Sequence, residues 1–200
     1  MTEPLRIALA DLEEAFTEVG AETMQHLRPG ISPAEQREIL APTGLELSEE
    51  LATWWQWRNG TIVPDERADY GRAEFIGIFR LTSIEESIQL SDDWRQMLAS
   101  GASDQDPRVE WPTDFLTIGK SRDPYAARTG PTRESEVWTW DIDGEIDNHT
   151  RCSASLAEAV GVWARAIRER WWIWDPQAAR WQLGNTEDIP VGIDLSRVVG

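Results

Sequence analysis

A set of helix-start signals, spread along the whole chain, constrains the fold more than any other feature of the sequence. Ser32, Ser48, Ser83 and Ser155 are each followed within three residues by a glutamate. A serine at this position accepts a hydrogen bond from a backbone N–H of the first helical turn. A glutamate in that turn is stabilised by the positive end of the helix dipole. The chain is therefore predicted to form helices that begin at these four positions.

A further helix is predicted before the first signal. Apolar residues recur every three or four positions from residue 4 to 27, and glutamates occupy the other face, a pattern typical of an amphipathic helix. Pro29-Gly30 should end it, Pro42 should stop the second helix and Asn59-Gly60 should close the third. The helix that begins at Ser83 should run to about residue 99.

Strand patterns follow in the second part of the chain. Short apolar runs bounded by polar residues are typical of strands, and residues 137–142 alternate with a period of two before the hairpin signal Asp143-Gly144. Helices first, and then strands separated by helices, predict an α+β fold with a mixed or antiparallel sheet. The predicted strands are residues 75–79, 115–119, 137–142, 171–176 and 180–183, and residues 121–134 are predicted to form a long loop.

The charge of the chain is strongly negative, with 36 acidic and 19 basic residues and a net charge of −17. Such a surface repels nucleic-acid phosphates and anionic lipids, and it attracts cationic proteins. The same acidity also fits a plain role in solubility. Because the first residues carry acids rather than lysine or arginine, and no run of about twenty apolar residues exists, a cytoplasmic location with no membrane or nucleic-acid partner is predicted.

The sequence contains no complete motif typical of catalysis or metal binding. A triad could be drawn from His149, Asp147 and Ser153, but the shaped turn around a nucleophilic serine is missing, and His26 lies at a helix end. Residues 141–147 lack the spacing of a calcium loop, which leaves only a weak metal contact open. The single cysteine excludes an internal disulfide. No enzyme, metal or cofactor is predicted, although abundant acids leave a carboxylate-based hydrolase as an alternative.

Tryptophan makes up twelve of the eighteen aromatic residues. Helical spacing places Trp54 and Trp57 on one face, and strand spacing places Trp138 and Trp140 on one face. Most tryptophans are expected in the core, but a chain of this size is not expected to bury all twelve, and exposed tryptophan is a frequent interface residue. Since the neighbouring residues are largely acidic, a protein partner is favoured over stacked nucleotides.

Three stretches of the chain carry motifs in a fixed order. Residues 31–60 contain a short helix, the link Gly44-Leu-Glu-Leu, and a helix that ends in tryptophan and Asn59-Gly60. Phe79-Arg-Leu-Thr-Ser-Ile-Glu-Glu-Ser leads a strand into a helix. Trp111-Pro-Thr-Asp-Phe-Leu-Thr-Ile-Gly precedes Val137-Trp-Thr-Trp-Asp. Over about residues 30–175 these stretches resemble the SUKH superfamily, of the Smi–Knr type. The chain departs from that pattern in its arginine-bearing segment 120–134 and in the helix before residue 28.

The resemblance implies a single SUKH-like α+β domain over residues 30–184, with a mixed or antiparallel sheet flanked by helices. Residues 1–29 would be an extra helical extension and residues 185–200 a tail. It implies no catalytic centre. Bacterial members look like immunity proteins that bind and neutralise toxins, often nucleases, whereas fungal members act as regulatory scaffolds. Both roles stay open as hypotheses at this point.

An acidic member of such a family would complement a basic toxin domain. We therefore predict a partner-binding surface made of tryptophans and of two acidic segments. Its residues are Trp54, Trp57, Asp65, Glu66, Asp69, Trp138, Trp140, Asp141, Asp143, Glu145 and Asp147.

Overall fold

The structure is a computed structural model that describes residues 2–62, 74–76, 79–99, 111–121, 124–140 and 149–184. The described helices are α1 (Glu3–Glu18), the 3-10 helix η1 (Thr23–His26), α2 (Pro33–Leu40), α3 (Glu49–Trp57), α4 (Ile84–Ala99) and α5 (Leu156–Arg168). The described strands are β1 (Leu27–Pro29), β2 (Arg58–Thr61), β3 (Arg80–Leu81), β4 (Phe115–Lys120), β5 (Tyr125–Arg128), β6 (Val137–Trp140), β7 (His149–Ser153), β8 (Trp172–Asp175) and β9 (Arg180–Leu183).

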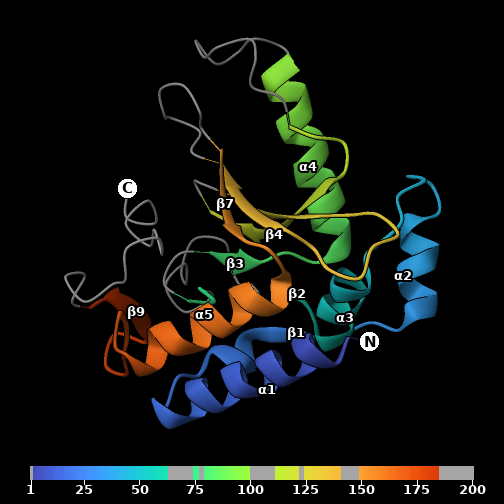
Figure 1. Ribbon diagram of the computed structural model, residues 1–200. Coiled ribbons are helices and arrows are strands. Elements are labelled where there is room, and N and C mark those ends of the chain that lie inside the picture. The colour runs from blue at the N-terminus through green and yellow to red at the C-terminus, as the bar shows by residue number, and fades with distance from the viewer. Residues whose placement is uncertain are drawn as a thin grey trace.

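The described strands form three sheets. The largest has the order β3-β4-β5-β6-β7, while β1 pairs with β2 and β8 pairs with β9. All of these pairings are antiparallel. Figure 1 shows α1 and α5 side by side on one side of the five-stranded sheet, with α4 standing beside β4. The predicted α+β class is confirmed.

The four predicted helix starts are confirmed at the level of single hydrogen bonds. Ser32 forms a capping box, since its Oγ accepts from the Glu35 N–H while the Glu35 carboxylate accepts from the Ser32 N–H at 2.7 Å. The hydroxyls of Ser48, Ser83 and Ser155 likewise accept from N–H groups three residues further on, at 3.0–3.2 Å. The serine signals in the sequence therefore predicted the starts of α2, α3, α4 and α5 correctly.

The N-terminal part differs from the prediction in where α1 ends. The helix stops at Glu18 instead of continuing to residue 27, and Gly20 takes a φ of +69°, which turns the chain away from the helix axis. Residues 23–26 then form η1, and β1 pairs with β2. Asn59-Gly60 lies inside β2 and not at the end of α3.

Two further predictions need correction. Residues 75 and 76 form a bend and not a strand, and the Phe75 N–H donates to the Phe79 carbonyl at 2.7 Å. The predicted loop 121–134 contains β5, which occupies the centre of the five-stranded sheet. By contrast, the final strand pair is confirmed as β8 and β9.

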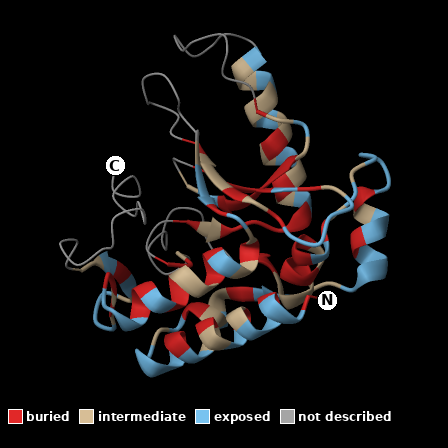
Figure 2. Cartoon of the chain, viewed as in Figure 1, coloured by how far each residue is buried: buried red, intermediate tan, exposed pale blue. Residues whose placement is uncertain are grey.

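The main core lies between one face of the five-stranded sheet and the helices α1, α3 and α5. Leu5, Leu9 and Leu12 of α1 are buried in it, so α1 shares this core with the rest of the fold. Figure 2 shows the buried residues on the inward sides of α1 and α5 and the exposed ones on the outward sides. Aromatic rings form its centre, where Trp163 lies 5.4–6.1 Å from Trp54 and Phe79 between ring centroids.

A second, smaller core lies on the other face of the same sheet, next to α4. It consists of Trp111, Phe115, Ala126 and Trp140, with the half-buried Trp94, Leu98 and Trp138 packed against them. The alternation along β6 explains the division, because Val137 joins the main core while Trp138 and Trp140 point to the opposite face. The prediction that Trp138 and Trp140 share a face is confirmed.

Candidate functional site

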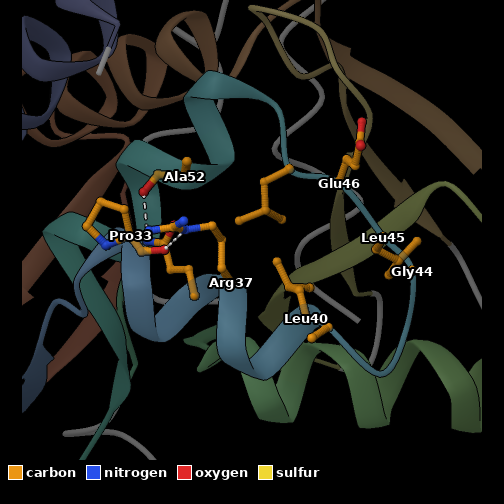
Figure 3. Close-up of a pocket in the computed structure, with 10 residues that line it drawn as sticks. Pro33, Arg37, Leu40, Gly44, Leu45, Glu46 and Ala52 are labelled. Carbon is orange, nitrogen blue, oxygen red and sulfur yellow. Dashed lines mark hydrogen bonds between the residues drawn. The ribbon is translucent and has the colours of Figure 1, made fainter.

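An open pocket of about 540 Å³ lies between α2, α3 and the connection that joins them. In Figure 3, α2 with Arg37 and Leu40 borders this pocket on one side, and the connection with Gly44, Leu45 and Glu46 borders it on the other. Most of the lining is apolar, and the polar groups are an amide, a guanidinium and a carboxylate. The lining residues are Pro33, Gln36, Arg37, Leu40, Ala41, Gly44, Leu45, Glu46, Leu47 and Ala52.

The shape of this pocket follows from the residues after α2. Pro42 cannot continue the helix, and the Thr43 hydroxyl donates to the Leu40 carbonyl at 2.8 Å while accepting from the Leu45 N–H at 3.1 Å. Gly44 then takes a φ of +69°, which suits a residue without Cβ. The connection therefore turns back at Gly44, and Leu45 and Leu47 lie along the pocket.

Acidic groups on α1 form ion pairs with arginines from α5 and β2. Arg168 of α5 donates to Glu18 at 2.9 Å and to Asp11 at 2.8 Å, and these hydrogen bonds, Glu18 first, raise the pKa of the Arg168 guanidinium. Arg58 pairs with Glu13 at 3.2 Å. These ion pairs join α1 to α5 and to β2, and Arg168 serves Asp11, Glu14 and Glu18 together.

The acidic groups around the pocket are different. Within the described part of the chain, the exposed Glu35, Glu38, Glu46 and Glu49 form no ion pair. Residues 32–50 contain one base, Arg37. Hydrogen bonds from the side chain and backbone of Ser32 hold the pKa of Glu35 below its ordinary value, so this carboxylate stays ionised. These four carboxylates on α2, α3 and their connection are thus without ion pairs among the described residues, and one of them, Glu46, lines the pocket.

Two of the predicted contact tryptophans are core residues. Trp54 has no exposed surface, and Trp140 is 3% exposed. Trp54 packs on the ring of Trp57 at 5.3 Å in the main core, whereas Trp140 lies 4.4 Å from Trp111 in the second core. The prediction that these two face a partner is wrong, because packing against neighbouring rings uses their whole surface.

Trp57 and Trp138 are half-buried and lie in different places. Trp57 lines a smaller pocket of about 220 Å³ against α1, and its indole N–H donates to the Glu13 carboxylate at 2.7 Å. Trp138 packs against the Phe115 ring in the second core at 6.2 Å. The structure does not bring the two predicted tryptophan pairs together. The predicted acidic contacts Asp65, Glu66, Asp69, Asp141, Asp143, Glu145 and Asp147 lie outside the described residues.

Glu50 is a buried carboxylate that sequence reasoning missed. It is 1% exposed, and its oxygens accept from the N–H groups of Ser135 at 2.7 Å, Leu156 at 2.9 Å and Ala157 at 3.1 Å. The carboxylate therefore caps the first turn of α5 and holds the segment before β6. These contacts assign Glu50 a structural role. In the described ranges, no group of three or more histidine, cysteine or acidic side chains is placed to hold a metal ion.

Residues in the motifs that carried the family resemblance position the backbone. The Asn59 side-chain oxygen accepts from the Ile84 N–H at 2.9 Å, which caps α4. Gly60 has a φ of +87°, and a Cβ there would lie 2.6 Å from the Ser83 nitrogen. A Cβ on Gly119 would lie 2.4 Å from the Phe79 ring. The motifs thus account for close packing rather than for surface chemistry.

Comparisons with known proteins add no relative: a scan against protein-family models finds no family that matches the chain, and no curated protein matches it. Among the described helices, none is both long and apolar enough to cross a membrane. The sequence Gly44-Leu45-Glu46-Leu47 was the signal that could have indicated the pocket, since a glycine turn is followed by two leucines and a glutamate that all line it.

Proposed function

We propose that this chain is a non-catalytic protein-binding domain that binds a basic protein through the acidic surface formed by α2, α3 and their connection. The observation that carries the proposal is the contrast between paired and unpaired acids. Arg168 and Arg58 neutralise acids of α1, whereas Glu35, Glu38, Glu46 and Glu49 are exposed and without ion pairs in the described part of the chain. Unpaired carboxylates can be desolvated by a cationic partner without first breaking internal ion pairs.

The distribution of charge supports the same surface. Residues 2–62 contain eleven acids and four arginines, whereas residues 149–184 contain three acids and five arginines. The loop beside α3 adds Arg133 and Glu134, whose charges offset each other. The N-terminal part of the chain therefore carries a net negative charge among the described residues, which attracts a basic partner and raises its association rate at low salt.

Toxin neutralisation in the cytoplasm is the biological form of this function that the SUKH resemblance supports. A nuclease toxin binds phosphates with a basic surface, and an acidic protein that covers this surface competes with its substrate. A regulatory scaffold with a housekeeping partner would use the same kind of contact. The two roles differ in whether a toxin is bound and inhibited.

Co-expression with any toxin-like protein that is encoded beside the gene tests the proposal. We expect the chain to restore growth, to form a complex with the toxin domain, and to bind more weakly as salt rises from about 50 to 500 mM, because screening shortens the reach of surface charges. Absence of both rescue and complex would overturn the immunity role. If the gene has no toxin-like neighbour, the scaffold role is favoured.

A matched pair of double variants tests the acidic surface itself. Glu38→Gln with Glu49→Gln should lower the association rate with the neighbouring toxin by about tenfold at low salt. Glu22→Gln with Glu85→Gln removes the same charge from exposed positions outside this surface. Equal rates for the two double variants would show that the net charge, and not this surface, steers binding.

A further inference from the structure

We infer that the pocket between α2 and α3 is an anchor site for neighbouring apolar side chains of the partner, flanked by lysine or arginine. The inference rests on the proposed function for its biological partner and deepens it, because it names the point on the acidic surface at which a basic segment docks. It stands on the lining of the pocket, on its rigidity and on the charge around it.

The lining favours apolar side chains. Leu40, Leu45 and Leu47 come from both sides of the pocket, and Ala41 is an exposed residue of its wall. A volume of about 540 Å³ has room for more than one side chain. The pocket is open, so a small molecule would keep one side in water, whereas a protein segment covers the opening with its own surface.

The walls are held in place before any partner binds. The Gln36 amide donates to the Ala52 carbonyl at 2.9 Å and joins α2 to α3. The Gly130 N–H donates to the Glu46 carbonyl at 2.8 Å, and the Glu49 N–H donates to the Thr132 carbonyl at 3.0 Å. A preformed pocket loses little conformational freedom on binding, which favours its use as an anchor.

The charges select a basic segment. Glu46 lies in the lining itself, and Glu38 and Glu49 lie on the two elements that border it. The one base of the lining, Arg37, is tied to its own helix by donating from Nε to the Pro33 carbonyl at 3.1 Å. An apolar side chain flanked by lysine or arginine meets both features, whereas an acidic segment would meet the Glu46 carboxylate, which has no ion pair among the described residues.

Selection of a randomised dodecapeptide library, displayed on phage, against the full-length chain tests the inference directly. We expect enrichment of peptides in which leucine, isoleucine, methionine or phenylalanine adjoins lysine or arginine. Synthetic versions of these peptides should bind the wild type at least tenfold more tightly than Ala41→Phe, whose ring occupies the pocket from an exposed position. Ala34→Phe places the same ring on α2 outside the lining and should bind as the wild type does.

A charge variant provides a second readout should Ala41→Phe not fold. Glu46→Lys should weaken the selected peptides about tenfold and flatten the salt dependence of their affinity, while Glu85→Lys, at an exposed position outside the lining, should change neither. Enrichment of acidic peptides would overturn the inference. So would a set of peptides that do not distinguish Ala41→Phe or Glu46→Lys from the controls.

The same variants separate this inference from the proposed function. If the neighbouring toxin binds Ala41→Phe and Ala34→Phe equally well, the acidic domain binds its partner elsewhere and the anchor site is refuted. If the selected peptides require the pocket but no toxin is bound, the anchor site stands and the immunity role fails.

Discussion

The two faces of the five-stranded sheet carry aromatic cores of different construction. On the first face, Trp163 and Phe75 lie in a continuous core to which α1, α3 and α5 all contribute. On the second face, Trp111 and Trp140 form a small core, and its neighbours Trp94 and Trp138 are only half-buried. The first core is thus sealed by three helices, whereas the second has one described helix, α4, over it.

The difference shows how this chain accommodates twelve tryptophans. Nine are buried and three are half-buried, which confirms the prediction that most, but not all twelve, would be buried. The strand β6 divides its side chains between the two cores, so neither core has to take every ring. We expect most of the folding free energy to come from the first face.

The largest expected effect compares one tryptophan from each face. Trp163→Ala should lower the free energy of unfolding by about 3–5 kcal/mol, because a fully packed ring is lost, whereas Trp138→Ala should cost about 1–2 kcal/mol. Urea unfolding followed by circular dichroism measures both. Equal losses would mean that the two cores contribute alike. If Trp163→Ala does not refold, the pair Trp163→Phe and Trp138→Phe should keep the same order.

A second effect comes from the buried carboxylate of the first face. Glu50→Gln should destabilise the fold by about 3 kcal/mol, because an amide cannot accept all three N–H groups that now bind the carboxylate. Glu49→Gln, at the exposed neighbouring position, should change the urea midpoint little. A stable Glu50→Gln variant would show that water replaces the lost acceptor.

A third effect should depend on pH. Burial raises the pKa of Glu74 to about 7, against a smaller opposing influence of Arg180. The folded state therefore holds this proton more tightly than the unfolded state, so its contribution to stability is complete below about pH 4.5 and is lost as the pH rises through 7. Glu74→Gln should stabilise the protein by about 1–2 kcal/mol at pH 8 and by little at pH 4.5.

Thermal unfolding of the Glu74→Gln variant at a series of pH values measures this effect. The exposed Glu85→Gln serves as the control. Glu74 precedes Phe75, a residue of the main core. If the difference in stability between the variant and the wild type is the same at every pH, the titration of Glu74 does not contribute to the pH dependence of stability.

The smallest effect tests how α4 is tied to the second face. The Ser91 hydroxyl accepts from the Thr117 N–H at 3.1 Å, so Ser91→Ala should cost about 1 kcal/mol. Ser87 lies one turn earlier on α4, and its buried hydroxyl has no hydrogen-bond partner among the described residues. Ser87→Ala should therefore be neutral or slightly stabilising. A lower urea midpoint for Ser87→Ala than for Ser91→Ala would contradict the role of the Ser91 hydrogen bond in holding α4 against the sheet.

Local signals in the sequence predicted what local chemistry decides. Ser32 and Ser155 start helices by bonding to N–H groups three residues away, and that relation is readable from the sequence. The end of α1 was missed because the apolar spacing continues past Gly20, whose positive φ breaks the helix. The strand β5 was missed because arginine, proline and glycine flank it, while its burial comes from strands on both sides.

The candidate site depended on relations that no local pattern contains. Glu18 forms an ion pair with Arg168, which is 150 residues away in the sequence. Only such long-range contacts show which acids are paired and which are not. The tryptophan prediction failed for Trp54 and Trp140 because burial depends on which elements meet over a residue. The acidic character of the chain was readable from composition, but which of its acids form ion pairs was not.

The three hydrogen bonds to the Glu50 carboxylate give this fold an internal reporter of global opening. The amides of Ser135, before β6, and of Leu156 and Ala157, in α5, come from two segments, and one side chain of α3 protects them all. Local fraying of α5 alone would expose two of these amides, whereas loss of α3 exposes all three. We expect them to exchange with solvent deuterium at one common, slow rate that follows complete unfolding of the chain.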